Sequence, residues 1–249
     1  MKIPLLAIDP GNKTMAKTLV LFDIDGTLSI TKGAGRESTA RTMLDMFGSD
    51  KNIRDLPFGG KTDWQILHEV LTDYGQDTTQ IAGVMAAYEA RLAHHLEAII
   101  HTYPVEACIG AHDLVNALHA MPDLVLGVVT GNTSLTAPIK LKAVGFDFTW
   151  FVANAYGSES ITRNALPALA ISRARQVTGY DFQPHEVIVI GDTVADIECA
   201  RAAKAVAVAV QTGFEALPLL QAAQPDYLLK DLTSFLDTVP LPHAQQRDA

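Results

Sequence analysis

Cysteine is scarce in this chain, which holds only Cys108 and Cys199 among 249 residues. The two lie far apart and outside any Cys-x-x-Cys or Cys/His spacing, which excludes a disulfide framework and a thiolate metal site. We therefore expect a reducing compartment, the cytoplasm. Long apolar runs are also missing, and no charged start leads into an apolar segment. We thus expect the protein to be neither exported nor embedded in a membrane.

Positive charge and aromatic side chains are also in short supply. Lys and Arg number 19 against 28 Asp and Glu, which gives a net charge of −9 without any basic run. Such a surface repels nucleic acid and anionic membranes, so we predict neither as a partner. Aromatic residues, at 7%, are too scattered for a stacking platform. A small anionic substrate remains compatible, because a metal ion and a few donors reverse the field locally. The oligomeric state stays open.

The two ends of the chain are expected to be peripheral. Residues 1–17 are interpreted as a loose N-terminal extension, because Pro10, Gly11 and Asn12 break any pattern. Met15 is an alternative start, which leaves open whether residues 1–14 belong to the natural protein. Residues 241–249 are interpreted as a C-terminal tail.

Between these ends, short apolar β-prone runs alternate with helical stretches. Uninterrupted runs of this kind are typical of strands buried on both faces of a parallel sheet. The predicted strands cover 18–23, 124–129, 186–190 and 205–210, and the predicted helices 135–144, 165–177 and 195–203. This alternation predicts an α/β fold with a doubly wound, Rossmann-like parallel sheet and right-handed crossovers.

One interval, residues 33–104, interrupts the alternation. It contains only helical periodicity, over 37–47, 64–74 and 78–101. Gly33 and Gly35 mark its start and Pro104 its end. The sequence therefore predicts an all-helical domain inserted into a core made of residues 18–32 and 105–240.

Polar residues follow the predicted strands where a parallel sheet binds ligands, beyond the carboxyl ends. The three groups are Asp23-Ile24-Asp25-Gly26-Thr27, Thr130-Gly131-Asn132 and Gly191-Asp192-Thr193, with Asp196 four residues after Asp192. Each group alone could be an ordinary turn or helix cap. Their occurrence in order, each at a strand end, instead indicates clustered carboxylates. Such a cluster needs a cation, and oxygen ligands without His or Cys favour Mg²⁺.

At these residues the sequence resembles the haloacid dehalogenase superfamily, over about residues 18–237. The first signature is Asp23-Ile24-Asp25-Gly26-Thr27-Leu28, the second is Thr130, and the fourth is the segment from Gly191 to Asp196. The resemblance implies that the helical insertion is a cap, as in phosphoglycolate phosphatase-like enzymes. The third signature is usually a Lys. Here Arg163 is the candidate, and Lys140, otherwise expected to be a solvated helix charge, is the alternative.

The resemblance also implies the chemistry. Asp23 would attack phosphorus and form an aspartyl-phosphate, and Asp25 would transfer protons to and from the reacting oxygens. Thr130, Gly131 and Asn132 would bind the phosphoryl group, and Arg163 would neutralise its charge. Mg²⁺ would lie on Asp23, the backbone carbonyl of Asp25 and Asp192, with Asp196 either ligating the ion or holding a metal-bound water. In the cap, Lys61, Thr62 and Asp63 are candidates for contacting substrate; otherwise they form a loop and the N-cap of the next helix.

These features predict a Mg²⁺-dependent phosphohydrolase, a phosphoric monoester hydrolase acting on a small phosphorylated metabolite such as phosphoglycolate. A phosphotransferase of the sugar-phosphate mutase kind is the main alternative, since it uses the same nucleophile. A regulatory protein on an inactive scaffold is disfavoured by the intact acidic set. A metal-independent haloacid dehalogenase comes last, because such enzymes generally lack the second aspartate, here Asp25. The physiological substrate stays open.

Overall fold

The structure is a computed structural model that describes residues 17–242. The predicted N-terminal extension, except Lys17, and the predicted tail from residue 243 onward lie outside the described residues. Among the described helices, none is long and apolar enough to cross a membrane.

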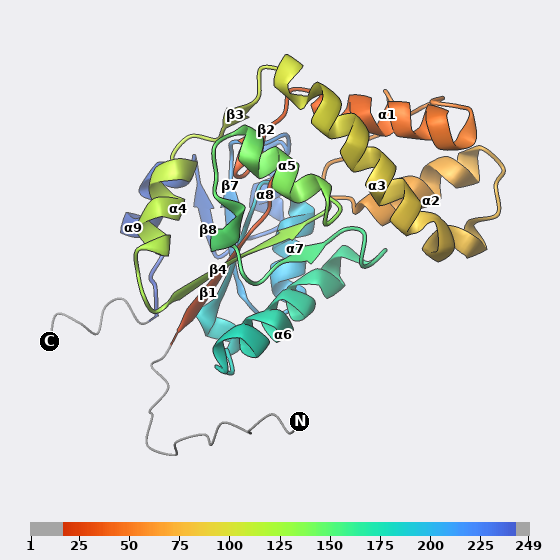
Figure 1. Ribbon diagram of the computed structural model, residues 1–249. Coiled ribbons are helices and arrows are strands. Elements are labelled where there is room, and N and C mark those ends of the chain that lie inside the picture. Colours follow the sequence, from red (N-terminus) through yellow and green to blue (C-terminus); the bar gives the residue numbers. More distant parts are fainter. Residues whose placement is uncertain (1–16, 243–249) are drawn as a thin grey trace, which may run out of the picture.

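A six-stranded parallel sheet forms the centre of the molecule (Figure 1). Its strand order is β5-β4-β1-β6-β7-β8. The strands are β1 (Thr18–Phe22), β4 (Leu124–Thr130), β5 (Ala155–Tyr156), β6 (Val187–Gly191), β7 (Val206–Val210) and β8 (Tyr227–Leu229). The prediction of a doubly wound α/β sheet is therefore confirmed. The strands β5 and β8 escaped prediction because two or three residues are too few to show a period.

Helices cover both faces of this sheet, and β1 shows why its sequence is apolar throughout. Val20 and Phe22 pack on one face and Leu19 and Leu21 on the other, since side chains alternate along a strand. The first face is covered by α4 (Ala111–His119), α5 (Thr136–Ala143) and α9 (Phe235–Thr238). The second is covered by α6 (Leu166–Thr178), α7 (Val194–Ala202) and α8 (Leu217–Ala222).

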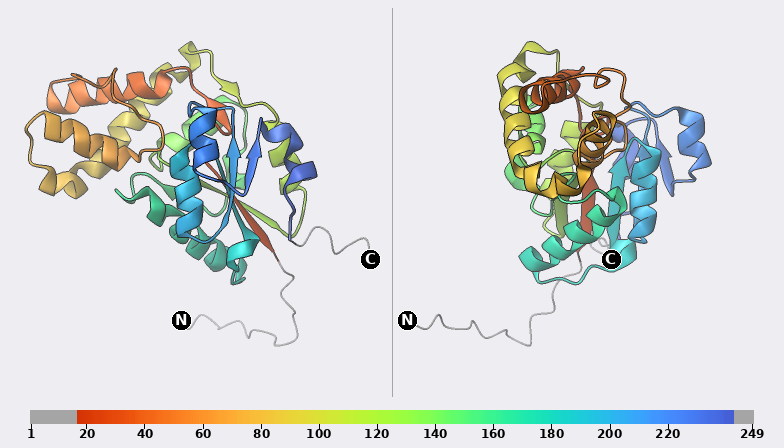
Figure 2. Two further views of the ribbon diagram at one scale, coloured as in Figure 1. Left: turned by 180° about the vertical axis from the view of Figure 1, so that it is seen from behind. Right: turned by 90° about the vertical axis from the view of Figure 1, so that its right-hand side faces the viewer.

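The helical insertion consists of α1 (Ala34–Phe47), α2 (Asp63–Asp73) and α3 (Ile81–Ile99). These helices lie together beyond the carboxyl ends of the strands and not on a face of the sheet (Figures 1 and 2). They share a hydrophobic cluster of their own, which includes Met43, Leu67 and the fully buried Tyr88. The chain enters and leaves the insertion through β2 (Ser29–Ile30) and β3 (Glu106–Ala107), which pair antiparallel. The two connections are thus held side by side.

Substitution of two glycines by alanine should change the stability of the fold in opposite directions. A Cβ on Gly127, in β4, would overlap the carbonyl oxygen of Ala153, whereas a Cβ on Gly83, in α3, would meet nothing within 4 Å. Gly127→Ala should therefore lower the free energy of unfolding by roughly 2–4 kcal/mol, because backbone cannot yield easily. Gly83→Ala should raise it by up to about 1 kcal/mol. Urea unfolding measures both, and equal effects of the two substitutions would contradict the packing described.

Candidate active site

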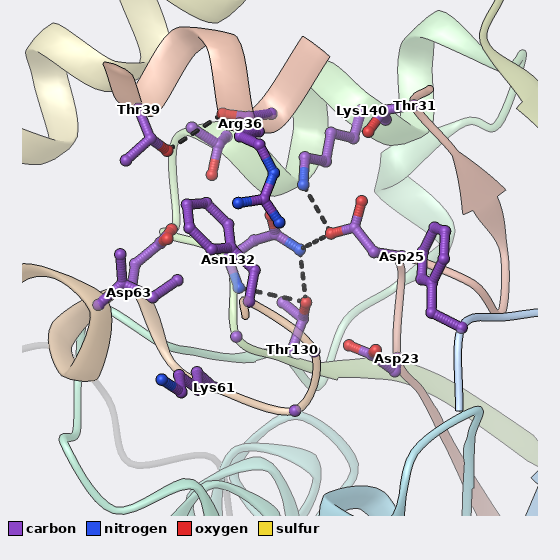
Figure 3. Close-up of a pocket in the computed structure, with 18 of the residues that line it drawn as sticks. Asp23, Asp25, Thr31, Arg36, Thr39, Lys61, Asp63, Thr130, Asn132 and Lys140 are labelled. Carbon is purple, nitrogen blue, oxygen red and sulfur yellow. Dashed lines mark hydrogen bonds and ion pairs between the residues drawn. The ribbon is translucent and has the colours of Figure 1, made fainter. Parts of the chain in front are cut away.

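The carboxyl ends of β1, β4 and β6 meet beneath the helical insertion, at a cavity of about 570 Å³ (Figure 3). Asp23 directly follows β1, Thr130 ends β4, and Asp192 directly follows β6. All three line this cavity. The strand ends that the sequence singled out are therefore brought together by the sheet order, in which β1 lies between β4 and β6.

A buried acidic cluster occupies one side of the cavity. Asp23, Asp192 and Asp196 offer carboxylate oxygens that all lie within 4.8 Å of one another. Their residues are only 6%, 1% and 3% exposed. Arg163, just before α6, enters this cluster: its Nη2 lies 2.5 Å from Asp196 Oδ1 and 3.2 Å from Asp23 Oδ1. One guanidinium thus faces three carboxylates, which leaves an excess of negative charge in a buried place.

The pKa values of Asp23 and Asp192 are raised in this buried, negatively charged environment. Burial raises the pKa of Asp23 to about 7; the nearby Arg163 opposes this rise, and Asp196 and Asp25 add to it. Burial, with repulsion from Asp196 and Asp23, also holds the pKa of Asp192 well above its usual range. A bound cation would reverse these shifts by favouring the ionised carboxylates. Because the donors are all oxygens, the cluster fits a hard divalent cation.

Local structure explains how the acidic side chains are held. Thr193 caps α7, and Asp196 Oδ2 accepts hydrogen bonds from Thr193 N at 3.0 Å and Thr193 Oγ1 at 2.6 Å. Asp192 Oδ2 accepts a hydrogen bond from Phe214 N at 3.1 Å. Gly26 lies against Asp192, since a Cβ there would lie 2.5 Å from Asp192 Oδ2, and its φ of +87° also favours glycine. Position 26 thus requires glycine, because the carboxylate of Asp192 leaves no room for a side chain there.

A second group of polar residues surrounds Asp25 (Figure 3). Asp25 Oδ2 accepts hydrogen bonds from Lys140 Nζ at 2.6 Å and from Asn132 Nδ2 at 2.8 Å. The same Asn132 nitrogen donates to Thr130 Oγ1 at 2.7 Å. Asp25 therefore lines the cavity beside Asp23 but has different partners.

The two candidate basic residues consequently have separate places. Arg163 contacts Asp23 and Asp196, whereas Lys140 contacts Asp25. Lys140 is only 6% exposed, so the expectation of a solvated helix charge is wrong for it. The reason is tertiary: α5 turns this face toward the strand ends, where Asp25 compensates the buried ammonium group.

The three substrate-contact candidates of the helical insertion, Lys61, Thr62 and Asp63, also have different places in the structure. Lys61 and Asp63 line the cavity, but Lys61 Nζ is paired with Glu69 Oε2 at 2.5 Å. Thr62 is fully buried and is not among the lining residues; its hydroxyl caps α2 by accepting from Gln65 N. The capping role that the sequence left open therefore applies to Thr62. Gly131 and Asn132 also line the cavity, and their role in phosphoryl binding stays a prediction.

Asp63 has a further role that the sequence did not indicate, because it fastens the insertion to the loop after β4. Asp63 N donates to Gly131 O at 2.7 Å, and Asp63 Oδ2 accepts from Thr133 N at 2.9 Å. Glu89 of α3 makes a second such contact, accepting from Ser134 Oγ at 2.6 Å and Leu135 N at 3.1 Å. Nothing in the periodicity of 78–101 distinguishes Glu89 from a solvated acid. It could be found only in three dimensions.

The fold and the site together define an enzyme of the doubly wound α/β class whose centre is built on aspartates. The chain belongs to the haloacid dehalogenase-like hydrolase family, whose model matches residues 20–210. It is 28% identical to a phosphoglycolate phosphatase of Synechococcus elongatus over 88% of this chain and 96% of that protein. It is 25% identical to the pyrophosphatase PpaX of Bacillus mycoides, over 87% of this chain and 94% of that protein.

A solved structure agrees with the fold. The hydrolase from Pseudomonas syringae matches with a TM-score of 0.63 at 22% identity, covering 89% of this chain and 97% of that one. The family model and the two relatives confirm the predicted family membership and the prediction of an enzyme of the phosphatase class.

Asp63 generates a prediction about pH. Burial raises the pKa of Asp63 to about 7, with Lys140 opposing the rise, against about 3.9 in an unfolded chain. The folded protein then binds the extra proton between about pH 4 and pH 7, so the free energy of unfolding falls as the pH rises through this window. The Asn of Asp63→Asn cannot titrate. Between about pH 5 and pH 7, the free energy of unfolding of this variant should therefore fall by roughly 2 kcal/mol less than that of the wild type.

Urea unfolding in the presence of a chelator at stepped pH measures this difference. Asp73→Asn changes an exposed aspartate of the same helix and should follow the wild-type curve. Parallel curves for Asp63→Asn and the wild type would show that Asp63 titrates as it does in the unfolded chain.

Proposed function

We propose that the protein is a Mg²⁺-dependent phosphohydrolase that acts on a small phosphorylated metabolite through an aspartyl-phosphate at Asp23. The observation that carries the proposal is the setting of Asp23. Its carboxylate is buried at the end of β1, faces the cavity, and lies 3.2 Å from the guanidinium of Arg163. A carboxylate so placed is poised to attack an electrophile, and the adjacent cation favours an anionic one.

The proposed metal ligands are the carboxylates of Asp23 and Asp192 and the backbone carbonyl of Asp25. Asp196 has both oxygens engaged, with Arg163 and with Thr193, so it supports the site by positioning Arg163 and by its charge. The excess negative charge of the buried oxygen donors fits Mg²⁺. When bound, the ion would supply electrostatic screening between an anionic nucleophile and an anionic substrate.

In the proposed reaction an oxygen of Asp23 forms a bond to phosphorus, and the bond from phosphorus to the leaving-group oxygen breaks. Asp25 enters this step in its protonated form and gives the proton to that oxygen. In the second half, Asp25 takes a proton from water while the water oxygen attacks phosphorus, which releases phosphate and restores the carboxylate of Asp23. Lys140 and Asn132 hold Asp25 in position by donating to its Oδ2.

Phosphoryl binding is assigned to the other strand ends. Thr130 Oγ1, the backbone N–H groups of Gly131 and Asn132, and Arg163 are proposed to stabilise the charge of the transferring group. Gly131 is suited to this task because its Cα lies against Arg163 Nη1 and the carbonyl of Lys61, where a Cβ would not fit. Arg163 is proposed to take the place of the usual Lys, and its Nη2 contacts both Asp196 Oδ1 and Asp23 Oδ1.

The helical insertion, residues 33–104, is proposed to act as a cap domain on the core of residues 18–32 and 105–240. It supplies one wall of the cavity, including Lys61 and Asp63, and would exclude water during the first step. The relatives named for phosphoglycolate and pyrophosphate support a small phosphorylated substrate of this kind. The cytoplasmic location and the lack of nucleic-acid and membrane partners stay predictions from the composition.

Asp23→Asn should abolish catalysis, because an amide cannot form the acyl phosphate. We expect phosphate release from p-nitrophenyl phosphate and phosphoglycolate in Mg²⁺ to fall by on the order of 10³-fold or more. Asp73→Asn, on the exposed side of α2, serves as the matched control and should keep wild-type rates. Equal rates for Asp23→Asn and wild type would rule out this nucleophile. Turnover that needs a bisphosphate activator and releases little phosphate would favour phosphotransfer.

Mg²⁺ should stabilise the folded protein even without substrate, because it neutralises buried carboxylates. At a Mg²⁺ concentration 100 times its dissociation constant, the gain is about 2.7 kcal/mol, which raises the melting temperature measured by calorimetry. Asp192→Asn should lose most of this gain, since it removes a ligand. NaCl at matched ionic strength controls for screening. A Mg²⁺-dependent rise that is as large in Asp192→Asn as in wild type would place the ion elsewhere.

A further inference from the structure

Four basic side chains line the cavity, and three of them are neutralised by carboxylates. These three pairings are Lys61 with Glu69, Lys140 with Asp25, and Arg163 with Asp23 and Asp196. The fourth is Arg36, near the start of α1. Within residues 17–242, its guanidinium contacts backbone carbonyls and an aromatic ring but no carboxylate. Arg36 therefore brings an unneutralised positive charge to the cavity wall.

The guanidinium of Arg36 is held rigidly. Its Nη1 lies 2.8 Å from Ile53 O, 3.1 Å from Arg54 O and 2.6 Å from Leu56 O. Its Cζ lies 4.3 Å from the centre of the Phe58 ring. One nitrogen is thus fixed by three acceptors, and the plane is held over an aromatic face. The remaining N–H groups keep a defined direction, which lowers the entropy cost of binding a ligand there.

The position of Arg36 in the cavity indicates which part of a substrate it could contact. Figure 3 shows its side chain reaching into the cavity, with the nitrogen ends of Asn132 and Lys140 between it and Asp25 in this view. Asp25 is the proposed proton donor to the leaving group. The part of a substrate that lies beyond the transferred phosphoryl group would therefore face the wall that carries Arg36.

We infer that Arg36 is a specificity-determining residue that binds a second anionic group on the leaving-group side of the substrate. This anionic group is a carboxylate or a second phosphate, since either accepts charge-assisted hydrogen bonds from a guanidinium. The preferred substrates are thus phosphorylated compounds with two anionic ends, and phosphate monoesters with an uncharged leaving group are poorer. This inference rests on the proposed function, since it takes the phosphoryl group to lie at Asp23.

The test compares substrates that differ only in the second charge. In 2-phosphoglycolate a carboxylate stands where 2-hydroxyethyl phosphate carries a neutral hydroxymethyl group; ethylene glycol bisphosphate and 2-hydroxyethyl phosphate form the pair for a second phosphate, with an alkoxide leaving group in both. Wild-type kcat/KM should favour the member with the second anionic group in at least one pair by at least about tenfold. Arg36→Met should remove that preference, mainly through KM, and change kcat/KM for p-nitrophenyl phosphate by no more than about twofold. The pair that responds identifies the anion.

Two further variants separate recognition from structure. Arg36→Lys keeps the charge without the fork and should retain part of the preference. Arg41→Met removes a more exposed cation of the same helix, which is paired with Glu37 outside the cavity, and should leave every ratio unchanged. An equal loss on all substrates in Arg36→Met and Arg36→Lys would mean that Arg36 only supports the loop of residues 53–56. A preference that survives Arg36→Met would also overturn the inference.

Failure of this inference can be told apart from failure of the proposed function. Turnover that depends on Asp23 but shows no preference for a second anion would leave the proposed function standing. If nothing is turned over, calorimetric binding of 2-phosphoglycolate and 2-hydroxyethyl phosphate to wild type and Arg36→Met decides the matter. Binding that is at least about tenfold tighter for the carboxylate, and only in wild type, supports Arg36 as the anion site. Equal binding contradicts it.

Discussion

The burial of negative charge at one edge of the sheet is the constraint on which the rest of this structure depends. Parallel strands deliver their carboxyl ends to the same edge, and here that edge receives Asp23, Asp192 and, from the first turn of α7, Asp196. Carboxylates so close and so buried repel one another, and Arg163 compensates only part of their charge. This surplus of buried negative charge favours a bound cation, and it is the physical reason for proposing Mg²⁺ at this place.

The cations of the cavity are arranged so that each has one function. Arg163 balances the acidic cluster, and Lys140 holds Asp25, which Asn132 links in turn to Thr130. Asp25 and Thr130, which are proposed for proton transfer and phosphoryl binding, are thus linked through one side-chain amide. Arg36 differs from these cations because backbone carbonyls, which carry no net charge, fix its position and leave its charge available to a ligand.

The helical insertion is joined to this centre through the hydrogen bonds of two acidic residues, Asp63 and Glu89. Asp63 accepts from the loop that follows β4, and Glu89 of α3 accepts from Ser134 and Leu135 a few residues further on. The loop that contains Gly131 and Asn132 is therefore in contact with the insertion as well as with the sheet. A displacement of the insertion would therefore have to break or carry with it the contacts to the loop after β4, which holds the residues proposed to bind the phosphoryl group.

Much of this arrangement follows from the sequence alone. It determined the buried strands, the helical insertion and the acidic residues at the strand ends, because hydrophobic period and short motifs are local properties of the chain. It missed the short β5 and β8, and it could not recognise Glu89 or Arg36, whose partners lie far from them in sequence or are backbone groups. Only the tertiary structure decided which cation meets which carboxylate. Lys140 and Asn132 reach Asp25 across 115 and 107 residues, and no local pattern encodes a contact that packing α5 against the strand ends creates.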